Sequence, residues 1–569
     1  TAVIFNEILS KAPVAPVRLN PELPDQLEDT INKALEKDRE IRCQTSKELL
    51  LDLKRLKRDT SGESVATSAV PAAAPVKRNY LWPVIVGGPG IIVVLLALFW
   101  PFSAAPSEET IDSIAVLPFE NVSNDPELAY LSDGIAESII NSLSQLSDLK
   151  VISRASSFQY RGADIDPQTV GEALGVRALV MGRVLVRGED LSIGVALVDV
   201  TENRQLWGEQ YDRNFTEILK IRQDIAREIS DKLRLQLTSE EEARLARTYT
   251  ENSQAHQAYL KGKFQQGKGE SEGYRQSILH FEQAIQSDPT YARAYAALAR
   301  SYYRLVLPTQ VVPSQEAMPQ AEAAARKALE LDESLSEAHA VLGDIKRSYF
   351  WDTAGAEEEY RLAMELDPGA FDAPNQYAFF LTAMERHDES AAMGRLAQQL
   401  SPLDPSMRTG ACIRLGYAGR YKEAIEQCQA ALELEPEYIS AHRDLGQIYE
   451  FMGLYQEAAT ARQKEWTLSG SSQQEVAGLT AAAISGQEDY WLFTLDYWER
   501  KSEQGFVSPI TFAEIYASLG ARDQALEWLE KAFQARSGSL YNLRVEPSWD
   551  PLRDDPRFQD LLRRMNLDP

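Results

Sequence analysis

The chain has 569 residues, of which 44% are hydrophobic and 25% charged, and a formal net charge of −26 at pH 7. This length is too great for one hydrophobic core and predicts several domains. The strong negative charge would repel phosphates over most of the surface, so we expect no nucleic-acid partner.

The first stretch, residues 1–59, has the pattern of short cytosolic helices. Apolar residues recur at helical spacing from Leu27 to Leu35. Residues 60–79 are rich in Ser, Ala and Pro, a composition typical of a mobile linker. The chain begins at Thr1 without a methionine or a signal peptide, so we expect it to be a piece of a longer product.

Residues 80–102 predict one transmembrane helix. The run from Leu81 to Phe102 carries no charge and is long enough to cross a bilayer. Basic residues precede the run and acidic residues follow it, which favours a cytoplasmic N-terminus. We therefore expect a single-pass protein of the inner membrane, extracytoplasmic after about residue 108. A buried core helix and a cleaved signal sequence are the alternatives.

Residues 111–236 alternate strand and helix signals and predict one α/β domain. The central feature is a β-hairpin pattern of two apolar runs around a turn at Gly188–Asp190. The expected elements are strands at 114–119, 151–152, 177–186, 191–200 and 205–211, with helices at 128–146 and 215–235.

From about residue 253 to residue 569 the chain repeats. Small residues recur every 34 positions, and a proline follows each of them. This period, with small residues where paired helices touch, is the pattern of TPR repeats and predicts roughly seven or eight stacked helix pairs. The residues are Ala363, Ala397 and Ala431, followed by Pro368, Pro402 and Pro436.

The stretch Ile31–Asp38, followed by Arg42, Gln44 and the run Glu48–Leu53, resembles the end of a Ser/Thr protein kinase catalytic domain. The resemblance implies that Arg42 is a structural residue pairing with a glutamate after the activation segment. The motifs that hold ATP and magnesium are absent, so we expect no catalytic or metal residue and no cofactor in this chain. ATP and Mg²⁺ are expected only for a full-length kinase.

Several short stretches in residues 111–236 resemble the extracytoplasmic α/β domain found at the N-terminus of TolB and in FlgO-like proteins. In such proteins the domain commonly precedes TPR repeats and is joined to a kinase, a cyclase or a DNA-binding domain. The resemblance therefore implies an architecture more than a chemistry. The stretches are Ala115–Phe119, Gly134–Glu137, Arg154–Ser157, Leu174–Val176 and Leu206–Asp212.

Some local signals are misleading. His442–Leu445 spells the start of a kinase catalytic loop, but Gly446 and Tyr449 stand where that family has lysine and asparagine. The helical register of a repeat accounts for these residues better, so we reject the match. We also expect the histidines of the repeats, His256, His339 and His442, to be structural or exposed.

The three cysteines, Cys43, Cys412 and Cys428, are too few for a disulfide framework or a zinc site. Cys412 and Cys428 fall in one helix pair. We expect them to be reduced core residues, because the usual 8–10 Å between helix axes discourages the approach that a disulfide needs.

The remaining functional surface is the concave groove of the repeats, which in such superhelices usually binds extended peptides. Four arginines would suit a carboxylate-rich ligand, whereas a solvated face with ordinary salt bridges is the alternative. The candidate groove residues are Arg293, Arg300, Tyr303, Arg304, Asn375, Phe379, Arg443 and Gln447.

Together these patterns predict a multidomain, mainly α protein. Its parts are a helical kinase remnant, one transmembrane helix, a TolB/FlgO-like α/β domain and a TPR α-solenoid. We expect a membrane-anchored signalling protein that binds protein or peptide partners in its groove and could form a homodimer. The alternatives are a non-enzymatic membrane-tethered adaptor and the same sensor coupled to cyclase or transcriptional output.

Overall fold

The computed structural model describes residues 111–567, apart from short gaps at 124, 126–127, 163–164, 188–189, 215–217, 234, 236, 248 and 308–311. The predicted kinase-like segment 1–59 with Arg42, the linker 60–79 and the span 80–102 lie outside the described residues. The described part is mainly helical, with one small sheet.

The sheet combines parallel and antiparallel pairing in the order β3-β1-β4-β5-β6, with β2 also paired to β4. Strand β1 lies between β3 and β4 and runs parallel to both, and the long strands β4, β5 and β6 form an antiparallel meander. The predicted hairpin is confirmed, since Ala178 pairs with Asp199 and Arg187 with Asp190. The strands are β1 (Ser113–Val116), β2 (Glu120–Asn121), β3 (Lys150–Val151), β4 (Ala178–Arg187), β5 (Asp190–Asp199) and β6 (Arg204–Asn214).

Helices cover both faces of this sheet because alternate residues of the buried strands point to opposite sides. Ile114 and Val116 of β1 pack with α6 (Ala129–Leu143) and α9 (Ile218–Lys232). Ala115 packs on the other side with α8 (Pro167–Leu174). The short helices α7 (Arg154–Ser157) and α10 (Ser239–Leu245) complete the domain.

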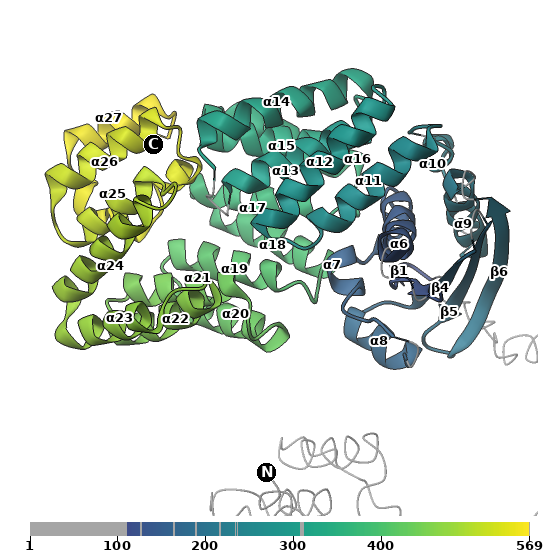
Figure 1. Ribbon diagram of the computed structural model, residues 1–569, viewed down its shortest axis with the longest axis horizontal. Coiled ribbons are helices and arrows are strands. Elements are labelled where there is room, and N and C mark those ends of the chain that lie inside the picture. The colour runs from purple at the N-terminus through teal and green to yellow at the C-terminus, as the bar shows by residue number, and fades with distance from the viewer. Residues whose placement is uncertain are drawn as a thin grey trace, which may run out of the picture. The chain divides into compact units, whose positions relative to one another are not determined.

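Eight antiparallel helix pairs follow in the described part of the chain (Figure 1). They are α11 (Ser253–Gln266) with α12 (Ser271–Ser287), α13 (Ala292–Val306) with α14 (Ser314–Leu331), α15 (Ser336–Ile345) with α16 (Thr353–Leu366), α17 (Asp372–Ala383) with α18 (His387–Leu400), α19 (Pro405–Tyr417) with α20 (Tyr421–Leu434), α21 (Ile439–Phe451) with α22 (Tyr455–Leu468), α23 (Gln473–Ser485) with α24 (Gln487–Ser502), and α25 (Pro509–Ser518) with α26 (Arg522–Gln534).

The residues of the 34-residue period pack as expected. Ala363, Ala397 and Ala431 are at most 1% exposed, and each lies near the end of the second helix of its pair. A methyl group at this position allows neighbouring helices to approach closely, and the proline that follows ends the pair. The repeat pattern read from the sequence is therefore confirmed.

The last repeat contacts the middle of the array. A π-helical turn, η3 (Lys346–Phe350), ends at Trp351, whose ring stacks on Phe533 of α26 with 4.8 Å between the centroids. Arg536 donates a hydrogen bond from Nη1 to the carbonyl of Tyr349 at 2.9 Å. The chain then ends in two short 3-10 helices, η4 (Gly538–Asn542) and η5 (Pro547–Leu552), and in α27 (Pro556–Arg564).

The α/β domain is held directly against the repeats. The amide of Ser153 donates to the carbonyl of Leu400 at 2.8 Å, and the amide of Leu403 donates to Ser156 Oγ at 2.9 Å. The amide of Gly369 donates to the carbonyl of Ser144 at 3.1 Å. Figure 1 shows α7 beside the end of α18 and the start of α19. Segments about 250 positions apart in sequence thus meet in one compact body.

The predicted single-pass topology in the inner membrane is contradicted. None of the helices among residues 111–567 is long and apolar enough to cross a bilayer. The longest of them, α14, has 18 residues and carries Glu316, Glu322, Arg326 and Lys327, charges that a lipid interior would not tolerate.

The predicted reduced state of the two repeat cysteines is also wrong. Cys412 of α19 and Cys428 of α20 form a disulfide, with their Cα atoms 5.4 Å apart. Both residues are fully buried together with Ala424. Small side chains at the contact between the two helices of a pair let the backbones come closer than the average helix spacing, on which the expectation of free thiols rested.

Candidate functional site

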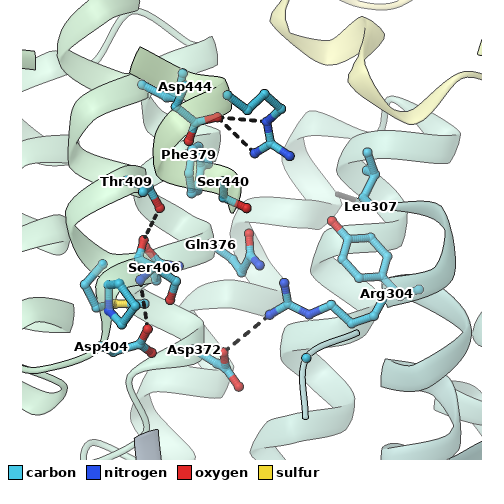
Figure 2. A pocket seen from close by; sticks show the side chains of 18 of the residues that line it. Arg304, Leu307, Asp372, Gln376, Phe379, Asp404, Ser406, Thr409, Ser440 and Asp444 are labelled. Carbon is cyan, nitrogen blue, oxygen red and sulfur yellow. Dashed lines mark hydrogen bonds and ion pairs between the residues drawn. The ribbon is translucent and has the colours of Figure 1, made fainter. Parts of the chain in front are cut away.

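A groove with a cavity volume of about 1760 Å³ lies along the inner helices of the repeats. Its walls come from α13, α17, α19, α21 and α25, with α6 and α7 of the α/β domain at one end. Figure 2 shows side chains from several of these helices converging on it. The structure brings all eight predicted groove residues to its lining, namely Arg293, Arg300, Tyr303, Arg304, Asn375, Phe379, Arg443 and Gln447.

The predicted arginines have partners that the sequence pattern did not indicate. Arg300 is 4% exposed and lies 3.7 Å from Asp344 and 3.9 Å from Asp372. Those distances exceed hydrogen-bond length, and its Nε and Nη1 atoms have no hydrogen-bond partner among the described residues. Arg304 lies 3.8 Å from Asp372. A dashed line in Figure 2 marks this ion pair. The positive charge of this helix is therefore largely balanced by acids from later repeats.

The other two arginines are engaged as well. Arg443 pairs with Asp444 at 2.9 Å, and the guanidinium of Arg293 lies 3.6 Å from the ring centroid of Tyr249. Neither contact removes the residue from the groove lining. An anionic ligand would have to compete with Asp444 for Arg443, so the net attraction is smaller than for a free arginine.

The α/β domain supplies its own charges to the groove. Glu137 of α6 pairs with Lys263 of α11 and with Arg154 of α7, each at 3.3 Å. Burial alone would lower the pKa of the Lys263 ammonium, but Glu337 and Glu137 raise it above its usual range. These pairs connect the domain to the repeats and fix one wall of the groove.

The opposite end of the groove is acidic. The carboxyl of Glu546 is 2% exposed, and Gln447 Nε2 donates a hydrogen bond to its Oε1 at 3.1 Å. Burial raises the pKa of Glu546 to about 7. Burial and the nearby Glu546 raise the pKa of Glu514 as well. Glu450 by contrast is paired with Arg462 at 2.9 Å. The carboxyls of Glu514 and Glu546, whose pKa values are raised, have no cation within ion-pair distance among the described residues.

Three groove features were not predicted from the sequence. Glu514 and Glu546 are not among the candidate groove positions, and Arg414 reaches the groove wall from behind. Arg414 could have been found from the sequence, because a charged residue at a position that the repeat register buries is unusual.

The histidines behave as the sequence predicts. His442 lies within α21 and is 9% exposed, with Nε2 3.0 Å from the carbonyl of Pro436. His256 lies 3.2 Å from the hydroxyl of Tyr291. Burial alone would lower the pKa of His339, but its hydrogen bond with Glu359 at 2.6 Å raises that pKa above its usual value. Within residues 111–567, no three His, Cys, Asp or Glu side chains are grouped so that they could hold a metal ion.

Two family models match parts of the chain. The TPR repeat model matches residues 417–453, which contain α20 and α21. The chain contains TPR repeats. Residues 109–228 match the second domain of HilA/YgeH-like transcriptional regulators, a different family from the TolB and FlgO-like proteins suggested by the sequence motifs.

A curated relative is named "Putative adenylate cyclase 3" from Rhizobium meliloti (strain 1021). It is 36% identical over 189 residues, which are 33% of this chain and 32% of the relative. The chain thus spans about a third of that relative's length. Neither the two family models nor this relative is named as a kinase, so the kinase resemblance of residues 1–59 gains no support from them.

Two solved structures match part of the chain. PilF of Pseudomonas aeruginosa is 19% identical and covers 45% of this chain and 96% of its own, with a TM-score of 0.27. YrrB, described as a TPR protein with an unusual peptide-binding site, is 21% identical. The match covers 35% of this chain and 95% of YrrB, with a TM-score of 0.24. Such low scores support no conclusion about ligands.

Proposed function

We propose that this TPR protein is the partner-binding part of a signalling protein, and that its groove holds an extended segment of another protein. The observation that carries the proposal is the groove of about 1760 Å³ between the inner helices of the repeats and the α/β domain. Stacked repeats commonly present such concave surfaces to extended peptides. The buried charges along this groove would fix the register of a bound segment.

The two ends of the groove differ in how their charges are paired, which supports a directional ligand: the cations near the α/β domain have acidic partners, whereas the two carboxyls at the other end have no cation partner among the described residues. Lys263, Arg300 and Arg304 lie toward the α/β domain, and Glu514 and Glu546 lie at the other end. An acidic peptide at the arginines, as expected from the sequence, remains part of this proposal. A segment bound there would exchange hydration for contacts with groups that the fold already holds in place, which lowers the ordering cost of binding.

Occupancy of the groove would control an output domain. The resemblance of residues 1–59 to a kinase favours Ser/Thr phosphorylation with ATP and Mg²⁺. The relative named "Putative adenylate cyclase 3" favours cyclic nucleotide synthesis instead. Measuring protein phosphorylation and cyclic AMP in cells that express the complete gene product, with and without a groove ligand, separates these outputs. A change in one of them alone identifies the output.

The binding proposal is tested by selecting short random peptides on the full chain and then blocking the groove. Ser440 lines the groove and is labelled in Figure 2, whereas Thr460 of α22 is exposed and lies outside the lining. Each is replaced by cysteine in a background with Cys43→Ser and is coupled to a bulky maleimide.

Coupling at position 440 should abolish binding of the selected peptides, and coupling at position 460 should leave it unchanged. Peptides that still bind the protein blocked at 440, or a selection that yields no peptide, would contradict the proposal.

A further inference from the structure

Arg414 of α19 is a buried cation without a carboxylate partner. It is 7% exposed, and among the described residues no acid lies within ion-pair distance of its guanidinium. Its Nη1 donates a hydrogen bond to Asn375 Oδ1 at 3.3 Å, and its Cζ lies 4.9 Å from the ring centroid of Phe379. Burial lowers the pKa of Arg414 to about 10, so the group is still charged at neutral pH.

This situation differs from that of the other cations at the groove. Arg304 has Asp372 within 4.0 Å, and Arg443 has Asp444. A charge removed from water is costly unless an opposite charge accompanies it. A buried arginine that the described residues leave uncompensated therefore points to a counter-charge from a bound ligand.

Arg414 lies directly behind the groove wall. Asn375, Phe379 and Gly410 all line the groove. A Cβ at Gly410 would stand 3.0 Å from Arg414 Nη1 and 3.4 Å from both Asn375 Oδ1 and the Phe379 ring. Because Gly410 has no side chain, no Cβ covers Nη1 of Arg414 at this point of the wall, and a ligand atom could approach the guanidinium across the Cα of Gly410.

The groups at this point can bind an anion. The two N–H groups on Nη1 allow Arg414 to keep its bond to Asn375 and to donate a second one. The amide oxygen of Asn375 accepts from Arg414, while its NH₂ group has no hydrogen-bond partner in the described part of the chain. Both groups are donors, and one of them carries a full positive charge.

Nearby acids are already occupied and do not compete for Arg414. Figure 2 shows Asp372 directed toward Arg304. Asp444 is paired with Arg443 at 2.9 Å. Asp404 caps α19 by accepting a hydrogen bond from the amide of Ser406 at 2.8 Å. None of them is among the groups that shift the pKa of Arg414, for which burial is the cause.

We propose that Arg414, Asn375 and Gly410 form a binding site for one anionic group of the partner segment, a carboxylate or a phosphate. The inference rests on the proposed function, because the ligand reaches this site through the groove. It adds a single fixed point at which the segment must carry a negative charge.

Two parallel peptide selections test it, one on the unchanged chain and one on Arg414→Gln. The unchanged chain should enrich Asp or Glu at one position of its peptides, and the variant should select groove binders without that enrichment. Binders that lack the enrichment in both selections overturn the anion site but leave the groove proposal standing. The absence of any groove binder refutes the groove proposal and, with it, the site.

Synthetic versions of one selected peptide, with Glu, phosphoserine or Gln at the enriched position, then separate the two sources of charge. Loss of a charge-assisted hydrogen bond should weaken binding at least about tenfold, so Gln should bind that much more weakly than the better of the other two. Equal binding of all three peptides overturns the site.

Two alanine substitutions control for the fold. Gly410→Ala keeps the charge but covers Nη1 from the groove side, and it should weaken the anionic peptide about as much as Arg414→Gln does. Gly505→Ala adds a Cβ with nothing within 4 Å, at an exposed position outside the groove lining, and it should leave binding unchanged. Equal effects of the two substitutions would contradict the site.

Discussion

Glu546→Gln should stabilise the C-terminal repeats at neutral pH and have little effect in acid. Burial raises the pKa of the Glu546 carboxyl from 4.5 to about 7. The folded chain therefore binds this proton more tightly than the unfolded chain, and stability is lost as the pH rises from about 4.5 to about 7. A difference of about 2.5 pKa units corresponds to about 3 kcal/mol. Glutamine keeps an oxygen for the bond from Gln447 but cannot ionise.

The measurement is hydrogen exchange of the amides in α25 and α27, followed at about pH 8 and about pH 4.5 and corrected for intrinsic rates. The variant should gain about 3 kcal/mol of protection at the higher pH only. Glu437→Gln, at an exposed position of the groove lining, changes the net charge equally and serves as the control. An equal gain at both pH values, or the same gain in the control, would refute the reasoning.

The fold and the sequence lead to three further predictions. Replacing Cys412 and Cys428 by alanine should cost about 3 kcal/mol in urea unfolding, because the disulfide closes a loop with a sequence separation of 16, and a cost near zero would contradict this. Gly369→Ala places a Cβ 2.6 Å from the Ser144 carbonyl and should speed hydrogen exchange in residues 144–157, whereas Gly505→Ala should not. The chain 1–569 should transfer no radiolabelled phosphate from ATP, since the kinase nucleotide-binding motifs are absent, and any transfer above a buffer control would overturn this.

Much of the repeat architecture was predictable because it depends on local spacing. The alanines at 363, 397 and 431 mark helix contacts that recur with the period of the repeat, and the inner-helix positions then follow by register. That register is why all eight candidate residues reach the groove lining. The β-hairpin was predictable for the same reason, since its strands are neighbours in sequence.

Contacts between distant segments were not predictable in this way. The pairing of Arg300 with Asp344 and Asp372 depends on how successive repeats stack, and helical periodicity does not indicate it. The contacts of Arg414 with Asn375 and Phe379 depend on a helix of the preceding repeat. The disulfide was missed because an average helix spacing was applied to a pair whose contact is made by small side chains.

The most direct test of the groove as a partner-binding site is a crystal structure of the full chain with a selected peptide bound. The peptide should lie along α17, α19 and α21, in contact with Phe379 and Gln447 and with a carboxylate or phosphate over Gly410. A peptide bound on the outer helices or on the sheet of the α/β domain, with the groove empty, would contradict the account.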